Sequence, residues 1–216
     1  MKVINNKVTP AFGAIPIART KNKFKGLTTK IDLYELTKSD RKFIENLSLD
    51  TDFNKNLSKM EEFDRNRWKK VFDYTIESVQ NTENQAVIAF SGHKPCGILS
   101  FFDEVSSIFL DAVCAIPQHG GKRVNLGGTT LIYQLFKFAE SYKVKNITLS
   151  AVTDGPFDVI SKYKRLGFKD LGMEGNYVKM SCNQYKIKEK LKELSLIIEY
   201  EPVKNPEKVN LEDLIV

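Results

Sequence analysis

Residues 119–128 (HGGKRVNLGG) combine glycines, two basic residues and an asparagine directly before an amphipathic segment. That segment, residues 129–144, repeats apolar side chains at helical spacing: Leu131, Ile132, Leu135, Phe136 and Ala139. The first amides of a helix have no partner within it, and the helix dipole favours an anion there. Glycines let the backbone approach a phosphate, and Asn125 could cap the helix, so the pattern indicates a phosphate site. The alternative is a flexible loop that only precedes a helix.

Asp111 is the only charged residue in the apolar run 108–116 (IFLDAVCAI), which is typical of a buried strand. A carboxyl group among apolar side chains has a raised pKa, which suits a group that accepts and releases protons. Asp111 is therefore a candidate general base. The alternative is a salt-bridged or exposed residue at the outer edge of the strand. Asp103 and Glu104, in the preceding turn, are further candidates.

The three cysteines, Cys96, Cys114 and Cys182, are widely separated, and no histidine accompanies them at the spacing of metal ligands. This argues for a reducing compartment, in the simplest case the cytoplasm, and against a disulfide framework or a metal site. Cys114 lies in the apolar run without a nearby histidine, so we expect a core or cofactor-lining thiol rather than a nucleophile. His93 and His119 are expected to be loop residues.

The basic residues are unevenly distributed along the chain. Residues 1–30 hold seven of the 33 basic side chains and none of the 27 acidic ones, so the rest of the chain has a net charge of −1. We therefore predict a basic, flexible N-terminal arm over residues 1–30, which could target the protein, contact an acidic partner or only keep it soluble. No apolar run approaches the roughly 18 residues of a membrane helix, and the first residues do not resemble a secretory signal.

The apolar periodicities predict strands around Ile31 and Leu33 and over residues 86–91, 97–102, 108–116, 147–152 and 176–182. They predict helices over residues 39–47, 58–80 and 129–144, and a short helix ending at Gly167. The three strands between residues 86 and 116 are joined by short turns and should form an antiparallel meander. The strand–helix–strand portion 108–152 predicts one parallel pair.

This element order resembles that of the GCN5-related N-acetyltransferase (GNAT) superfamily over residues 30–182. Two motifs carry the resemblance. The loop at residues 123–128 (RVNLGG) is similar to the family's Gln/Arg-x-x-Gly-x-Gly/Ala loop before the central helix. The short helix ends in the family's Tyr-x-x-x-Gly-Phe signature, which begins at Tyr163 (YKRLGF). The chain departs from the pattern at Leu126, which replaces the first loop glycine, and Gly127 follows directly.

The resemblance implies an α+β fold with a mixed, mostly antiparallel sheet of about six to seven strands and helices on both faces. We divide the chain into the arm (1–30), a GNAT-like acyltransferase domain (31–182) and a C-terminal helix and strand extension (183–216). The implied co-substrate is acetyl-CoA or another acyl-CoA, without a metal. The residues that would bind it are Cys114, Ala115 and Ile116 beside the pantetheine arm, and Arg123, Val124, Asn125, Leu126, Gly127, Gly128 and Thr129 around the pyrophosphate.

In the family, a tyrosine at the position of Tyr163 protonates the departing thiolate, and a central-strand carboxylate, here Asp111, takes the amine proton. A backbone N–H of the split strand, assigned to Cys114, would hold the oxyanion. The resemblance thus implies acyl transfer to a primary amine of a protein, peptide or small molecule by direct attack in a ternary complex. The alternative is a weak or inactive GNAT-fold binding module whose basic arm contacts an acidic partner or nucleic acid. We expect no nucleic-acid binding by the core domain.

Overall fold

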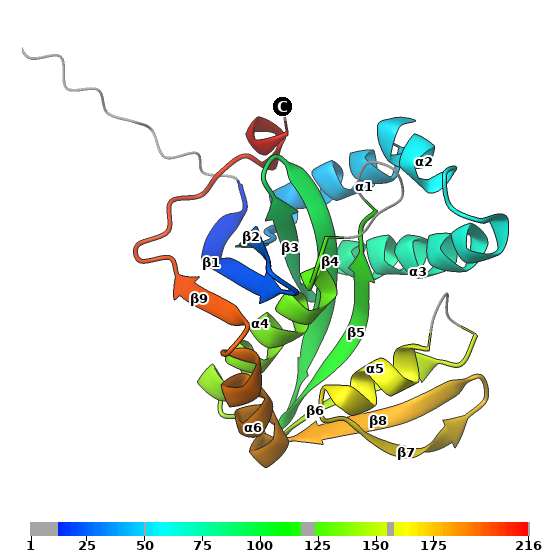
Figure 1. The fold of residues 1–216 in the computed structure, drawn as a ribbon, viewed down its shortest axis with the longest axis vertical. Helices are drawn as coiled ribbons and strands as arrows, with labels where there is room; N and C mark the ends of the chain where they lie inside the picture. The colour runs from blue at the N-terminus through cyan, green and yellow to red at the C-terminus, as the bar shows by residue number, and fades with distance from the viewer. Residues whose placement is uncertain (1–12, 50, 118–123, 155–157, 216) are drawn as a thin grey trace, which may run out of the picture.

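The computed structural model describes residues 13–49, 51–117, 124–154 and 158–215. Within these ranges, nine strands form one sheet in the order β7-β8-β6-β5-β4-β3-β2-β1-β9 (Figure 1). They are β1 (Ile15–Phe24), β2 (Leu27–Glu35), β3 (Gln85–Ser91), β4 (Lys94–Glu104), β5 (Ser107–Ala115), β6 (Asn146–Val152), β7 (Lys169–Glu174), β8 (Tyr177–Asn183) and β9 (Ile198–Pro202). All neighbours are antiparallel except β5 and β6, which are parallel. The mixed, mostly antiparallel sheet is confirmed, with more strands than expected.

Helices cover both faces of this sheet (Figure 1). They are α1 (Arg41–Leu49), α2 (Thr51–Leu57), α3 (Glu62–Gln80), α4 (Gly127–Ser141), α5 (Val159–Arg165) and α6 (Gln184–Leu194). On one face, α3 contacts β4, β5 and α1. On the other, α4 contacts β3, β4, β5 and α6. The α+β class with two covered faces is therefore confirmed.

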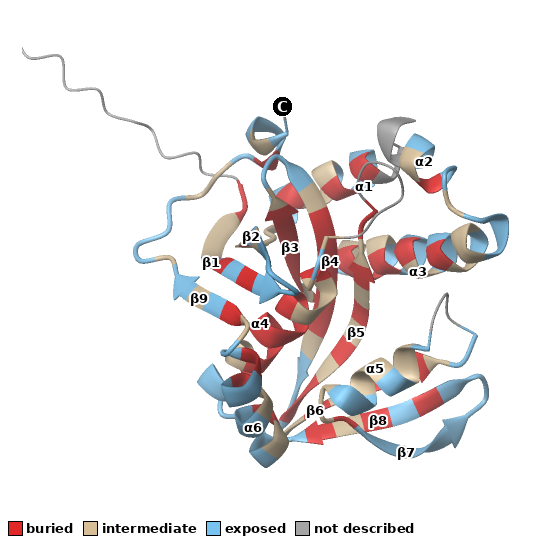
Figure 2. Cartoon of the chain, viewed as in Figure 1, coloured by how far each residue is buried: buried red, intermediate tan, exposed pale blue. Residues whose placement is uncertain are grey.

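The side chains of β3 alternate between two cores, one on each face of the sheet. Val87 and Ala89 pack in the core that contains α4 and α6, whereas Ile88 and Phe90 pack in the core that contains α1 and α3. The middle residues of β3 and β4 are consequently all buried (Figure 2). Each large apolar side chain buried in this way contributes about 1.5–3 kcal/mol. This two-sided packing is why both strands are continuously apolar in the sequence.

The prediction of a flexible arm over residues 1–30 is wrong for residues 13–30, which contain β1 and the start of β2. Residues 1–12 lie outside the described residues. β1 lacks an apolar alternation because its inward side chains are small or polar. Ala18, Thr20 and Asn22 are each at most 2% exposed. A hydrophobic pattern alone cannot reveal a strand of this composition.

The basic residues of β1 have acidic neighbours within the sheet. Lys21 lies opposite Glu199, and Arg19 lies opposite Glu201, in the antiparallel pair of β1 and β9. Lys23 also forms an ion pair with Glu199. Opposite charges that face each other across antiparallel strands favour their pairing. Part of the N-terminal basic excess therefore complements a strand near the other end of the chain.

The C-terminal extension contains the expected helix and strand, α6 and β9. Because β9 pairs with β1, the extension belongs to the same sheet as the N-terminal strands. β7 is absent from the predicted set. It has only two apolar side chains in alternation, Leu171 and Met173, and all six of its residues are exposed. None of the helices in the described ranges is long and apolar enough to cross a membrane.

Candidate active site

The parallel strands β5 and β6 separate partway along their length. Their facing pairs begin at Ser107 and Asn146 and end at Leu110 and Leu149. Beyond that point no further pair joins the two described strands. The backbone of β5 from Asp111 onward therefore has β4 on one side and no strand on the other. Figure 1 shows β5 running away from the group formed by β6, β8 and β7. We call this separation the strand opening.

Asp111 forms a β-bulge where the strand opening begins. In the pair of β4 and β5, Phe101 faces Leu110 and Ser100 faces Ala112, which leaves Asp111 as an extra residue. A bulge bends its strand and redirects a side chain. Here it directs the carboxylate toward α3, as its hydrogen bonds demonstrate.

Three donors hold the Asp111 carboxylate. The Tyr74 hydroxyl donates to Oδ1 over 2.7 Å, and the Ser78 hydroxyl donates to Oδ2 over 2.5 Å. The side-chain amide of Asn84 also donates to Oδ2, over 3.0 Å. The prediction of a lone carboxylate among apolar side chains is therefore wrong. Asp111 is half-buried, and its partners in the described part of the chain are neutral, so it is not a salt-bridged edge residue either.

The two oxygens of Asp111 differ in their surroundings. Oδ2 is bonded to Ser78 and Asn84, which are both buried, whereas Oδ1 is bonded to Tyr74, which is 51% exposed. Burial, and next the hydrogen bond to Asp111, raises the pKa of Tyr74 to about 12, so its phenol remains a donor at neutral pH. A carboxylate oxygen can accept two hydrogen bonds. Oδ1 is thus the oxygen with room for a further donor.

Sequence reasoning did not identify Tyr74, Ser78 or Asn84 as partners of Asp111. One signal was present: Tyr74 and Ser78 are four residues apart in a predicted helix, a spacing that puts both on one face. Asn84 comes from the connection between α3 and β3, and its approach to Asp111 depends on how the strands are aligned. Strand alignment cannot be read from one sequence when both faces are apolar.

The other two candidate acids lie at the closed end of β5. Asp103 accepts a hydrogen bond from the Gln85 amide over 2.9 Å, and Glu104 accepts one from the Ser107 hydroxyl over 2.5 Å. Ser107 belongs to the part of β5 that still pairs with β6. These carboxylates are therefore engaged at the opposite end of β5 from the strand opening.

Helix α4 begins with an unusual backbone conformation at Leu126. This residue precedes Gly127 and is left-handed, with φ 61° and ψ 10°. The amides of Gly128 and Thr129, in the first turn, have no hydrogen-bond partner among the described residues. A Cβ placed on Gly128 would have no atom of the described residues within 4 Å, so their packing does not require glycine there. Two donors and open space therefore face outward from the start of α4.

In the described part of the chain, the other residues of the predicted pyrophosphate loop offer no side chain that is seen to bond the start of α4. Arg123 lies outside the described residues, as does His119. Asn125 is exposed and does not cap α4, because Leu126 is the N-cap residue and no side chain bonds the first turn. Val124 is half-buried against the core, and its carbonyl accepts the Gly127 N–H over 3.1 Å. The turn into α4 is thus held by backbone contacts.

The predicted pantetheine strand ends beside the start of α4. Cys114 is buried in the core on the α3 side and pairs with Ile98 of β4. The Ile116 N–H donates to the Cys96 carbonyl over 2.9 Å, so this N–H is already engaged. That Cys114, Ala115 and Ile116 line the pantetheine arm stays a prediction. The same carbonyl lies 3.6 Å from the position of a Cβ on Gly127. The start of α4 therefore lies at the far end of the opened part of β5.

The Tyr163 signature is a helix-terminating motif. The N–H of Phe168 donates to the Tyr163 carbonyl and that of Gly167 to the Lys164 carbonyl, both over 3.0 Å. Gly167 has a left-handed φ of 94°, as predicted. These bonds form a Schellman motif, and the rings of Tyr163 and Phe168 pack edge to face at 5.5 Å. The motif fixes where α5 ends and thereby where the tyrosine ring lies.

Tyr163 and Asp111 lie on opposite faces of the sheet. Tyr163 packs against the core that contains α4, whereas Asp111 bonds to α3 on the other side. Burial raises the pKa of Tyr163 above its ordinary value, so its phenol stays protonated far into the alkaline range. The two candidate catalytic groups could therefore act on one bound molecule only through the strand opening.

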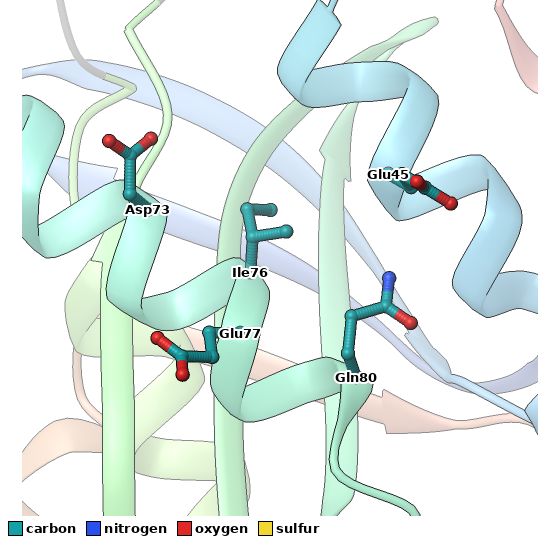
Figure 3. Close-up of a pocket in the computed structure, with 5 residues that line it drawn as sticks. All are labelled: Glu45, Asp73, Ile76, Glu77 and Gln80. Carbon is teal, nitrogen blue, oxygen red and sulfur yellow. The ribbon is translucent and has the colours of Figure 1, made fainter.

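A separate hollow of about 450 Å³ lies between α1 and α3 and is open to solvent (Figure 3). Its lining residues are Glu45 of α1 and Asp73, Ile76, Glu77 and Gln80 of α3. Asp111 is not among them. The charge of Glu77 nevertheless contributes to the raised pKa of Tyr74. An acidic surface thus borders the side of the sheet on which Asp111 is held.

No family model and no curated protein sequence matches this chain. Among solved structures, apo FdhC, a nucleotide-linked sugar GNAT, matches with a TM-score of 0.54 and 14% identity, over 77% of this chain and 94% of that one. The chain has the GNAT fold. A further match is the PaiA N-acetyltransferase of Thermoplasma acidophilum in complex with coenzyme A, with a TM-score of 0.49 and 16% identity over 71% and 98% of the two chains. At these identities the likeness concerns the GNAT fold and not the substrates.

Proposed function

We propose that this protein is an acyl-CoA-dependent N-acyltransferase, with acetyl-CoA as the natural co-substrate. The observation that carries the proposal is the strand opening, which starts at the Asp111 bulge and ends beside the first turn of α4. An extended molecule could lie along the free edge of β5 as an added strand does. The reducing interior of the cell, the cytoplasm in the simplest case, is the compartment we propose for it.

The start of α4 suits the pyrophosphate of coenzyme A. The amides of Gly128 and Thr129 are donors without partners among the described residues, and no acidic side chain lies in the first turn. The positive end of the helix dipole favours an anion at the same place. The open space beside Gly128 allows a phosphate to approach the backbone. These features support the residues from Val124 to Thr129 as the binding turn.

The reaction requires two proton transfers, and the two groups proposed for them lie on opposite faces of the sheet. The amine nitrogen attacks the thioester carbonyl carbon, the new N–C bond forms and the C–S bond breaks. Asp111 accepts the proton that the amine loses, through the Oδ1 atom that has room for a donor. Tyr163 gives its proton to the sulfur as the C–S bond breaks. Because a phenol (pKa about 10) is a weaker acid than a thiol (about 8.5), the phenolate then recovers a proton from solvent, which completes the proton balance. Burial of Tyr163 keeps that proton in place until the thiolate forms.

The acceptor is a primary amine, and its surroundings favour one that carries positive charge. Glu77 and Asp111 flank Tyr74, and Glu45 also lines the hollow, whereas the Asp73 carboxylate there is paired with Lys69 over 3.0 Å. Negative charges at a surface raise the local concentration of cations and disfavour anions. A small polyamine-like molecule and a basic peptide both satisfy this requirement.

The binding-module alternative has less support. Its motivation is Leu126, yet this leucine adopts the left-handed conformation that a glycine would supply, so the path of the turn is retained. Its proposed contact surface, the basic N-terminal segment, is in part paired with the acidic strand β9. Both observations favour an enzyme.

The proposal is tested by release of free thiol from acetyl-CoA in the presence of amines. The panel should include diamines, a lysine-containing basic peptide and an acidic peptide with one lysine. We expect thiol release with the cationic acceptors and little with the acidic peptide. Acetyl-CoA binding without thiol release from any acceptor would favour the binding module. A protein that neither binds acetyl-CoA nor releases thiol would overturn both the enzyme and the coenzyme site.

A further inference from the structure

Leu126 holds a backbone conformation that its side chain disfavours. Its φ of 61° lies in the left-handed region, where a Cβ crowds the neighbouring carbonyl. Glycine occupies this region without strain, but leucine requires its surroundings to hold it there. The amides of Gly128 and Thr129 follow directly, so their direction depends on this conformation. The question is which contacts maintain it.

A chain of two hydrogen bonds, one buried and one partly buried, ends on the Leu126 carbonyl. The Thr130 hydroxyl donates to that carbonyl over 2.9 Å, beside the backbone bond from the Thr130 N–H over 2.8 Å. The side-chain amide of Asn22, on β1, donates to the Thr130 hydroxyl oxygen over 2.7 Å. A hydroxyl has one proton, so while it donates to Leu126 it can only accept from Asn22. In both bonds the donor therefore lies on the side of β1 and the acceptor on the side of the turn: Asn22 donates to Thr130, and Thr130 donates to Leu126.

Asn22 is costly to keep at this position. Asn22 is 1% exposed and Thr130 is fully buried. The Asn22 Oδ1 atom has no partner among the described residues, and an unpaired buried acceptor destabilises a protein. An apolar side chain of the same shape would remove that penalty. Stability of the folded chain therefore does not explain why an asparagine is present.

We propose that Asn22 and Thr130 are positioning residues for the coenzyme-binding turn. They hold Leu126 in its left-handed conformation and so direct the amides of Gly128 and Thr129 toward the ligand. The inference rests on the proposed function, because it takes that ligand to be coenzyme A. It gives β1, 108 residues earlier in the chain, a part in binding the coenzyme.

The first test measures coenzyme A affinity by calorimetry in folded variants, with unfolding free energies measured separately. Thr130→Val removes the hydroxyl at constant shape and should weaken binding roughly 5- to 10-fold, the size expected for one buried hydrogen bond. Thr130→Ser keeps the hydroxyl and should restore affinity. The matched control is Thr75→Val on α3, since the fully buried Thr75 makes the same kind of bond, to the Val71 carbonyl over 2.7 Å. It should leave coenzyme affinity unchanged.

Asn22→Leu separates positioning from stability. It should weaken coenzyme binding while leaving the unfolding free energy unchanged or higher, because it removes the unpaired Oδ1 atom. If Asn22 had a purely structural role, the substitution would change the unfolding free energy and leave the affinity for coenzyme A unchanged. This variant also keeps the proposal testable if Thr130→Val fails to fold.

The decisive test is rescue by glycine at the strained position. With L126G also present, Thr130→Val should cost little affinity, because glycine adopts the left-handed conformation without help. An equal loss with and without L126G would overturn the proposal, as would unchanged affinity in both Thr130→Val and Asn22→Leu. If the wild-type protein itself does not bind coenzyme A, the proposed function fails instead. The two failures are therefore distinguishable.

Discussion

The Ser78 hydroxyl donates a 2.5 Å hydrogen bond to the Asp111 carboxylate, and this contact joins α3 to the bulge at which β5 and β6 separate. Asp111 is the only residue that forms a bulge where β4 pairs with β5. With Tyr74 and Asn84 as further donors, its position is set by three side chains from outside its own strand. Preorganisation of this kind is typical of groups that act on a bound molecule.

Replacing Asp111 by asparagine should lower kcat/KM by roughly 10²- to 10⁴-fold, the usual contribution of a general base. The same change should reduce the free energy of unfolding by about 1–3 kcal/mol, because the single amide oxygen of asparagine cannot accept all three bonds from Tyr74, Ser78 and Asn84. Steady-state rates and urea denaturation measure the two effects. Asp103→Asn, at the closed end of β5, is the matched control and should leave the rate unchanged. An active Asp111→Asn enzyme would remove this residue from the mechanism.

The raised pKa of Tyr74 predicts a loss of stability in alkaline solution. Between its ordinary pKa of 10 and the native value of about 12, the unfolded chain loses the phenol proton while the native protein keeps it. The contribution of Tyr74 is therefore complete below pH 10 and falls as the pH rises toward 12. Tyr74→Phe should flatten this part of the pH–stability curve, measured by urea denaturation. Curves of equal slope for the variant and the wild type would contradict the assignment.

Tyr163→Phe should lower kcat by roughly 10²-fold and leave the affinity for acetyl-CoA unchanged, because only the proton donor to the thiolate is lost. The ring contact with Phe168 is retained, so stability should not change. Tyr142→Phe, at the C-cap of α4, is the control, since burial also raises the pKa of Tyr142 and its ring stacks on Phe138. A Tyr163→Phe enzyme with wild-type kcat would leave the thiolate without its proposed acid.

Gly128→Trp should abolish the thermal stabilisation that acetyl-CoA provides and leave the unliganded protein as stable as before. The indole would extend into the open space in front of the first turn, where we expect the pyrophosphate. Gln184→Trp makes the same addition in the first turn of α6 and should preserve stabilisation by acetyl-CoA. Undiminished stabilisation of Gly128→Trp would mean that the coenzyme binds elsewhere.

The central strands and helices were predictable because their periodicity reflects local burial. Val87 and Ile88 on adjacent positions of β3 are both buried, and a run of this kind reads as a strand covered on two faces. β1 was not predictable in the same way. Its inward Asn22 and Thr20 are polar, and Glu199, the partner of Lys23, lies on β9, far along the chain.

The sequence was sufficient to predict individual candidate residues of the site, but not the contacts that position them. The YKRLGF motif located Tyr163 because a Schellman motif has a local signature, and Asp111 was conspicuous as a charge in an apolar run. The bulge at Asp111 depends on the alignment of β4 with β5, which the sequence does not encode locally. The left-handed Leu126 broke the expected glycine pattern. The bonds from Thr130 to its carbonyl, with Asn22 behind Thr130, suggest why it is tolerated.

A crystal structure of the protein with acetyl-CoA tests most directly whether the coenzyme binds along the strand opening. We expect the pyrophosphate within hydrogen-bond distance of the Gly128 and Thr129 amides. The thioester should lie in the strand opening, with Asp111 and Tyr163 on its two sides. Acetyl-CoA bound away from α4, or a sheet in which β5 and β6 pair along their whole length, would contradict the account.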